Sequence, residues 1–193
     1  MNDAGIFRQI NKIEFQIINN SLIKISAKFS ATLDNLKSIL YISIEKSTTE
    51  KLFPKIFLIS YDQIKLINEI NLKETIYAVG LYFGFIKKGN FYLSIEGAEY
   101  LSKQKLFSEF QRIEVNELGE KSILYGNHIL KKMVVKIPEK LNENCFLLVF
   151  NESGEIIAIA RSNVNKKSLQ ELSANKIIAI NLSDKGYYLR KKQ

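Results

Sequence analysis

The most specific catalytic possibility in the sequence is a thiol–imidazole dyad of Cys145 and His128, the single cysteine and the single histidine of the chain. A nucleophilic thiol needs a neighbouring base that keeps it as the thiolate. Cys145, however, opens the apolar run CFLLVF, where a small buried residue is expected. A nucleophilic serine would also have to use His128, and no GxSxG elbow is present. We therefore expect no catalytic residue and no enzyme.

Metal and cofactor sites have little support in the sequence. One histidine and one cysteine cannot supply the three or four ligands of a zinc site. The phosphate-cradling loops GxGxxG and GxxxxGK[ST] are missing. Gly80 and Gly84 lie in an aromatic, strand-like run, where glycine permits close packing or a bulge. The sequence predicts neither a metal nor a cofactor.

The basic residues point to a polyanion. The chain has a net charge of +8, and residues 161–193 contain eight basic side chains against the acidic Glu171 and Asp184. Such an asymmetry is typical of a nucleic-acid-binding face, although a lysine-rich surface also serves solubility. Arg161, Lys166 and Lys167 are favoured as contacts because they flank a polar connection after an apolar strand. The full set of candidate contacts is Arg161, Lys166, Lys167, Lys131, Lys132, His128, Lys176, Lys185 and Arg190.

The elements of the first part of the chain have the patterns of an α/β domain. Apolar residues three or four apart predict helices over 6–18 and over 62–70, the second capped by Asp62. Alternating apolar residues predict strands over 22–29, 37–46 and 55–60. A hairpin over 75–95 turns at KKGN, where Gly89-Asn90 supplies the positive φ, and a helix follows over 96–103.

After Phe110 the pattern changes to closely spaced strands with turn signals between them. The predicted strands cover 111–115, 122–126, 134–138, 145–150, 155–162 and 176–183. Only 127–132 and 168–172 interrupt them as helices. Many short strands with one or two small helices predict a small, closed or half-closed β-barrel. We expect an α+β protein with an N-terminal domain over 1–110 and a second domain over 111–193.

Nothing in the sequence indicates a membrane or a secreted protein. The apolar runs are shorter than the roughly 18 to 20 residues that a spanning helix needs, and the N-terminus lacks a hydrophobic signal core. A lone cysteine fits a reducing compartment. These features predict an intracellular, cytoplasmic protein.

The stretch LYGNHIL at 124–130, preceded by Ser122, resembles the strand and helix that open a PUA domain, a small RNA-binding barrel. The chain is similar, more specifically, to the ribosome biogenesis family named nuclear import protein seven, whose members have two domains. The resemblance extends over about 80–193 through Gly80, Phe83, Gly84, Phe91, Leu93, Ala98, Tyr100, Leu101, Ala160, Ser162, Ile177 to Ile180, Gly186, Tyr188 and Arg190. Two features depart from it: residues 116–119 stand where the family usually has Pro-Gly, and Ala158 stands where glycine is common.

The resemblance implies a non-catalytic RNA-binding factor for assembly of the large ribosomal subunit. Its PUA-type small mixed β-barrel would bind pre-rRNA, with a preference for uridine-rich single strands, while the N-terminal domain contacts other assembly proteins. It implies the cytoplasm of an archaeal cell, which the Ile/Lys-rich composition favours, or the nucleolus of a eukaryote. The alternatives are an accessory subunit of an RNA-modification enzyme and a translation-related PUA protein that binds tRNA.

The resemblance also implies roles for residues of the opening stretch. Asn127 would cap a helix after the turn at Gly126, and His128 would lie in its first turn, either packed there or in contact with RNA. Tyr125 would pack in the preceding strand or stack on a base. Lys131 and Lys132 would close the helix, where cations also suit the helix dipole.

Overall fold

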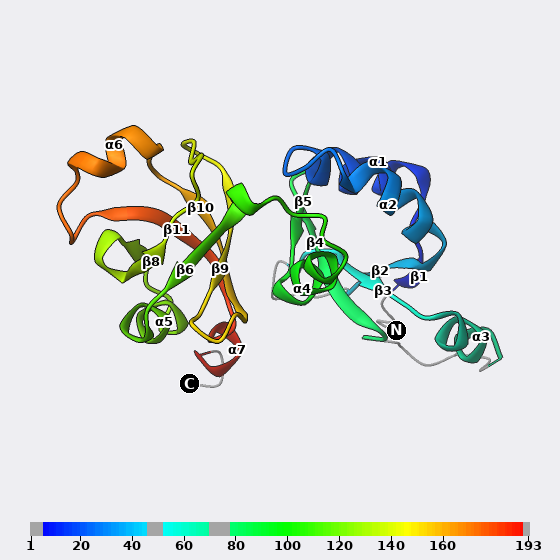
Figure 1. The fold of residues 1–193 in the computed structure, drawn as a ribbon. Helices are drawn as coiled ribbons and strands as arrows, with labels where there is room; N and C mark the ends of the chain where they lie inside the picture. Colours follow the sequence, from blue (N-terminus) through cyan, green and yellow to red (C-terminus); the bar gives the residue numbers. More distant parts are fainter. Residues whose placement is uncertain (1–5, 46–51, 70–77, 191–193) are drawn as a thin grey trace. The chain divides into compact units, whose positions relative to one another are not determined.

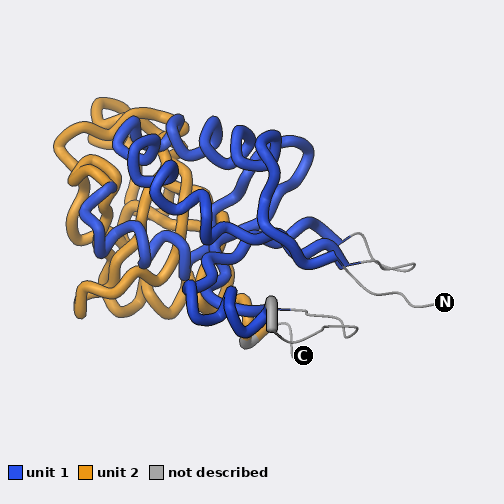
Figure 2. The backbone as a smooth tube through the Cα atoms, turned by 90° about the vertical axis from the view of Figure 1, so that its right-hand side faces the viewer, with its two compact units in different colours: residues 1–106 blue, residues 107–193 orange. Residues whose placement is uncertain are grey.

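The computed structural model describes residues 6–45, 52–69 and 78–190. The chain divides into two compact units, Met1–Leu106 and Phe107–Gln193, which Figure 2 shows in different colours. The division falls between Leu106 and Phe107, whereas the sequence predicts a domain boundary near Phe110. Each unit has a sheet of its own.

The first unit is built on a five-stranded antiparallel sheet in which each strand pairs with the next one along the chain (Figure 1). Its strands are β1 (Ile6–Gln9), β2 (Leu40–Ile44), β3 (Lys55–Leu58), β4 (Leu81–Lys87) and β5 (Asn90–Leu93). Its helices are α1 (Lys12–Ile23), α2 (Phe29–Leu36), the 3-10 turn η1 (Lys37–Ile39), α3 (Tyr61–Glu69) and α4 (Ile95–Lys103). Helix α1 packs on α2 and β5, and α4 packs on β4.

The predicted helix over 6–18 is wrong in its first half. Ile6–Gln9 forms β1 and pairs with β2, and the helix begins only at Lys12, after Asn11. Asn11 caps it, because its side chain accepts the Glu14 N–H at 2.9 Å and Glu14 accepts the Asn11 N–H at 2.8 Å. The apolar spacing fits a helix by coincidence, since Ile13 of the predicted face is exposed and Phe15 of another face is buried.

The predicted strand over 22–29 is also wrong. Leu22 and Ile23 end α1, a turn follows, and Phe29 begins α2. Burial of Leu22 and Phe29 decides the local structure, and the alternation of apolar residues between them does not. The strands predicted over 37–46 and 55–60 and the helix over 96–103 are confirmed as β2, β3 and α4 within the described residues.

Two predictions of local structure need correction, the cap of a helix and the turn of a hairpin. Helix α3 has its cap at Ser60, whose hydroxyl accepts the Gln63 N–H at 3.3 Å, so Asp62 lies inside the first turn. The β4–β5 hairpin is confirmed for its described part, but the positive φ values occur at Lys88 (48°) and Gly89 (72°), one position earlier than predicted. Residues 70 and 75–77 of these predictions lie outside the described residues.

The start of α1 gives a pH-dependent contribution to stability. Burial raises the pKa of Glu14, but the hydrogen bonds from Arg8 and from the Asn11 N–H outweigh it, so that the pKa lies below the ordinary 4.5. Arg8 donates to both carboxylate oxygens, at 2.9 and 2.7 Å. A carboxylate with a lower pKa in the folded state stabilises the fold above its unfolded pKa, and this is lost as pH falls through the folded pKa.

We therefore expect Glu14→Gln to lower the free energy of unfolding by about 1 kcal/mol at pH 7 and by less near pH 3. Denaturant unfolding of the wild type and the variant at both values of pH measures the difference. Gln63→Glu is a useful comparison, because it adds a carboxylate to a helix start that has no arginine partner like Arg8 in the described residues. An effect of Glu14→Gln that is the same at both pH values would contradict the linkage.

The second unit is built on a six-stranded sheet with the order β7-β11-β10-β9-β6-β8, in which only the β6–β9 pair is parallel within the described residues. The strands are β6 (Arg112–Val115), β7 (Ile129–Leu130), β8 (Val134–Lys136), β9 (Phe146–Phe150), β10 (Ile156–Ser162) and β11 (Ile177–Asp184). The helices are η2 (Glu109–Gln111), α5 (Glu117–Leu124), η3 (Lys131–Met133), α6 (Lys166–Glu171) and α7 (Tyr187–Arg190). Helix α5 packs against the sheet over a core that includes Ile123, Val149 and Ala160.

The segment that opens this unit has its helix and strand in the reverse of the predicted order. Residues 117–124 form α5, where the sequence predicts a turn and the strand 122–126, and Ile129–Leu130 forms β7, where it predicts a helix over 127–132. Asn116 is the helix cap, since its side chain accepts the Gly119 N–H at 2.8 Å. Gly119 lies within α5 and not in a turn, and a Cβ there would lie 2.8 Å from the Cβ of Met133.

The other strand predictions in this unit are confirmed as β6, β8, β9, β10 and β11, and the helix over 168–172 is confirmed as α6. The end of the chain differs from the expectation. Gly186, which the resemblance includes, precedes the short helix α7, and Tyr188 and Arg190 lie within that helix.

Candidate nucleic-acid interface

Five of the predicted contacts gather around α6 and define what we call the α6 lysine cluster: Lys131, Lys132, Lys166, Lys167 and Lys176. Lys166 and Lys167 begin the helix, which Asn165 caps by accepting the Ser168 N–H at 2.9 Å. The 3-10 turn η3 lies against the segment after the helix, because the Lys131 N–H donates to the Lys176 carbonyl at 3.0 Å. Two stretches far apart in the sequence, 131–132 and 166–176, therefore bring these lysines together.

Two ammonium groups of the cluster are hydrogen-bonded to the backbone. Lys131 Nζ donates to the carbonyls of Leu172 at 2.7 Å and Gln170 at 3.3 Å, at the end of α6. Lys166 Nζ donates to the Pro138 carbonyl at 3.3 Å. A cation at a helix C-terminus satisfies carbonyls that have no partner within the helix. These two side chains therefore hold α6 in place in addition to carrying charge.

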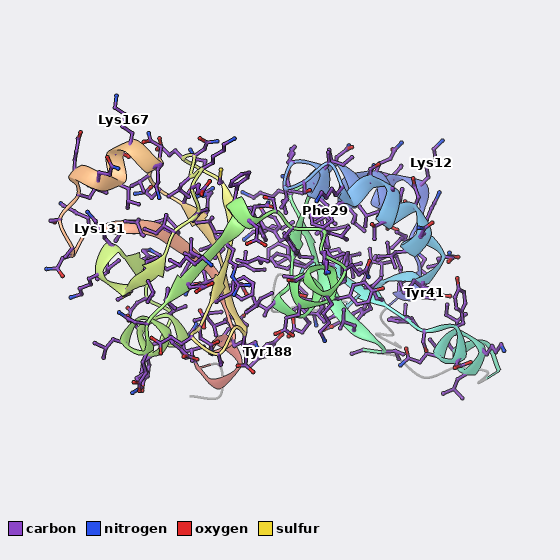
Figure 3. All side chains as sticks on the ribbon, in the orientation of Figure 1. Lys12, Phe29, Tyr41, Lys131, Lys167 and Tyr188 are labelled. Carbon is purple, nitrogen blue, oxygen red and sulfur yellow. The ribbon has the colours of Figure 1, made fainter. Side chains whose placement is uncertain are left out.

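The other three ammonium groups face solvent. Lys132, Lys167 and Lys176 are exposed, and the structure gives no hydrogen bond or ion pair to their side chains within the residues that it describes. Figure 3 shows Lys167 extending from α6 and Lys131 on the neighbouring segment. Between Arg161 and Ser183 the sequence has a single acidic residue, Glu171. The cluster therefore offers positive charge that a row of phosphates can neutralise.

An aromatic residue beside the cluster escaped the sequence predictions. Phe110 is 42% exposed, and Lys140 Nζ lies 5.3 Å from the centre of its ring. The segment that carries Lys140 packs along the start of α6, because the Lys166 N–H donates to the Leu141 carbonyl at 2.8 Å. Phe110 and Lys140 are thirty positions apart in the sequence, so only the fold shows that an exposed ring and a cation meet here.

Arg161 lies in β10, between Phe146 of β9 and Ile180 of β11. Its side chain is the exposed one in a strand whose other residues are buried. It precedes α6 in the chain, but the described residues show no hydrogen bond that joins its side chain to the α6 lysine cluster. The two favoured lysines and Arg161 are therefore neighbours in sequence that occupy different elements.

His128 lies in the loop between α5 and β7, and its predicted place in the first turn of a helix is wrong. Gly126, with φ of +90°, ends α5, so Asn127 does not cap a helix and donates instead from Nδ2 to the Ser122 hydroxyl at 3.2 Å. Tyr125 is 77% exposed, which rules out packing within a strand. Lys131 and Lys132 likewise belong to η3 and do not close an α-helix.

Arg190 is held by the interior of the unit. Its guanidinium donates to both carboxylate oxygens of Asp184, at 2.9 and 3.0 Å, and also to the Leu124 carbonyl. The hydrogen bond to Asp184 raises the pKa of Arg190. Asp184 is buried and also accepts from Asn181 Nδ2 at 3.0 Å. Lys185 is the next residue after Asp184. Its backbone N–H donates to the Ile157 carbonyl at 3.0 Å, and its side chain is exposed.

The dyad of Cys145 and His128 is excluded by the sheet order. His128 precedes β7 and Cys145 precedes β9, and β11 and β10 lie between these strands. Counted along the sheet, three strand spacings of about 4.8 Å each lie between the two residues, which is well beyond hydrogen-bond reach. Among the described residues, no group of three or more His, Cys, Asp or Glu could hold a metal ion. No helix in the same residues is long and apolar enough to cross a membrane.

Known proteins similar to the chain include ribosome biogenesis factors. A UPF0113 protein of Archaeoglobus fulgidus is 29% identical over 184 residues, 95% of this chain and 94% of that protein. A protein of Schizosaccharomyces pombe named 60S ribosome subunit biogenesis protein nip7 is 25% identical over 145 residues, which cover 71% of this chain and 78% of that protein. The name of the second relative describes an assembly factor and not an enzyme.

Solved structures share the fold along most of the chain. A PUA domain from Aeropyrum pernix has a TM-score of 0.65 at 12% identity, covering 96% of this chain and 89% of its own. A PUA domain protein from Thermoplasma acidophilum has a TM-score of 0.61 at 12% identity, covering 97% and 99%. The predicted α+β fold class with a C-terminal PUA-type barrel is confirmed. Residues 111–193 match the family described as UPF0113 PUA domain.

Proposed function

We propose that the chain is a non-catalytic RNA-binding factor in the biogenesis of the large ribosomal subunit. The observation that carries this proposal is the α6 lysine cluster on a unit that matches a PUA domain. The chain matches a relative named for 60S ribosome subunit biogenesis along most of that relative's length, which supports the ribosomal context. The RNA is pre-rRNA, and the protein takes part in its processing by holding it.

The contacts follow from the geometry of the cluster. Lys132, Lys167 and Lys176 neutralise phosphates, because their ammonium groups face solvent. Lys131 and Lys166 contribute charge from positions that hydrogen bonds to the backbone carbonyls of Leu172 and Pro138 fix. Phe110 offers a ring on which a base can stack, which suits a single strand better than a duplex with paired bases. A preference for uridine-rich single strands belongs to this proposal.

The other predicted contacts have different roles in the proposed RNA binding. Arg161, His128 and Lys185 are exposed and extend the surface available to RNA beyond the cluster. Arg190 is left out, because Asp184 and the Leu124 carbonyl already engage its guanidinium. The first unit contacts other assembly proteins. The protein acts in the cytoplasm of an archaeal cell or in the nucleolus of a eukaryotic one.

Sedimentation of a cell extract on a density gradient tests the ribosomal role. The tagged full chain is expected to co-sediment with precursors of the large subunit and to leave those fractions after RNase treatment. A chain that sediments with the small subunit, or only with free tRNA, would favour a translation-related PUA protein. Stable recovery with an RNA-modifying enzyme in place of ribosomal precursors would favour an accessory subunit.

A further inference from the structure

The first unit has a sheet face lined by aromatic side chains. Alternate residues of a strand point to opposite faces, and in β2 to β5 one set, such as Ile42, Ile56 and Phe91, is buried. That face is the one under helix α4, because a Cβ at Gly97 of α4 would lie 3.0 Å from the Phe83 ring. The opposite set of strand residues, which we call the aromatic face, consists of Phe7, Gln9, Tyr41, Ser43, Lys55, Phe57, Tyr82, Phe85, Lys87, Asn90 and Tyr92. Phe57 and Ser43 in the middle of this face are also buried, and Tyr92 at its edge is exposed.

The rings of this face form two groups across the strands. Phe7 lies 5.7 Å from Tyr41 and 6.2 Å from Phe57, between ring centres, and Tyr41 is labelled in Figure 3. At the β5 edge, Phe85 and Tyr92 are stacked, with centres 5.1 Å apart and planes 13° apart. Tyr92 is 45% exposed on the last strand of the sheet, although helix α1 packs on this strand and the Phe91 N–H donates to the Ser21 hydroxyl at 2.9 Å.

Positive charge accompanies the stacked pair. Lys87 Nζ lies 4.8 Å from the centre of the Phe53 ring, and Phe53 lies 5.9 Å from Phe85. A depression in the surface is lined by Phe53, Pro54, Ile86, Lys87 and Lys88. The strand residues of the aromatic face include lysines and no acidic residue, although Glu45 just after β2 pairs with Lys55.

We propose that the β5 edge of the aromatic face is a second binding site for single-stranded RNA, separate from the α6 lysine cluster. A base extends the stack at Tyr92, and the phosphates on either side meet Lys87 and Lys88. Stacked rings that end at an exposed tyrosine suit the flat face of any base, and the lysines suit the backbone between bases. An aromatic face that docks a protein would not need cations beside the rings, so charge favours the nucleic acid.

A single tryptophan reports on this site, because the sequence contains none. The variant Tyr92→Trp of the full chain is titrated with a ~10-nucleotide oligouridylate or oligoadenylate, a length within the usual site sizes. Stacking of a base on the indole is expected to quench its fluorescence saturably. The matched control is Tyr61→Trp, since Tyr61 of α3 is 65% exposed and lies outside the aromatic face. Inorganic polyphosphate, which has no bases, should leave both signals unchanged.

Affinity measured by the anisotropy of a labelled oligonucleotide completes the test. Tyr92→Ala should weaken binding about fivefold or more, whereas Tyr92→Phe should retain it. Binding that leaves the indole fluorescence of the Tyr92→Trp variant unchanged would overturn the proposal, while the α6 lysine cluster could still bind RNA. Quenching that persists when Lys132, Lys167 and Lys176 are replaced by glutamine would establish the site as independent of that cluster.

Discussion

The variant Gly186→Ala is expected to unfold with a free energy about 3 kcal/mol below that of the wild type. A Cβ at this position would lie 1.9 Å from the carbonyl oxygen of Leu124 and 2.7 Å from its carbon. Both are backbone atoms at the end of α5, so no side-chain rotation relieves the overlap. The start of α7 or the end of α5 must move, and the hydrogen bond from Arg190 to the same carbonyl is then lost.

Unfolding in urea, followed by circular dichroism and by hydrogen exchange of α5, measures this loss. The control is Gly154→Ala, where no atom lies within 4 Å of the added carbon and only the φ of +81° opposes the change. Its expected cost is about 1 kcal/mol. Equal costs for the two variants would show that α5 and α7 do not meet as closely as the structure has them.

The triple variant with Lys132→Gln, Lys167→Gln and Lys176→Gln is expected to bind single-stranded RNA with a salt dependence flatter by about 2 in the log–log slope. Each phosphate contact on a single strand contributes about 0.7 to that slope. The three ammonium groups have no partner in the part of the chain that the structure describes, so folding should not change. Affinity at low salt should fall most, because the lost contacts are electrostatic.

Filter binding or anisotropy over a range of salt concentrations gives both the slope and the affinity. The matched control replaces Lys12, Lys24 and Lys28 of the first unit with glutamine, which removes the same charge outside the α6 lysine cluster. Equal effects of the two triple variants would mean that net charge governs binding and that the cluster is not a site.

The sequence predicts the fold best where local signals and burial agree. Strands such as β3 and β10 are apolar runs that lie in the sheets, and Ser94 and Asn165 cap helices that are predicted nearly in place. The segment 116–130 was predicted wrongly because tertiary contacts decide its structure. Gly119 looks like a turn signal, but it is needed where α5 packs on Met133.

The candidate site shows the same contrast between what local sequence signals predict and what depends on tertiary contacts. Charge clustering finds the lysines around α6, since it requires only composition. It cannot show that Lys131 binds the carbonyls that end α6 or that Asp184 holds Arg190, because these contacts depend on the folded chain. The aromatic face was also missed, since its rings come from strands spread over residues 7–92 and meet only through strand register.

Crosslinking the full chain to RNA in cells, followed by sequencing of the bound RNA, tests the central claim most directly. We predict enrichment of large-subunit rRNA precursors, with crosslinked peptides that contain the α6 lysine cluster. Enrichment of tRNA with no large-subunit precursors would contradict the proposed role in large-subunit assembly.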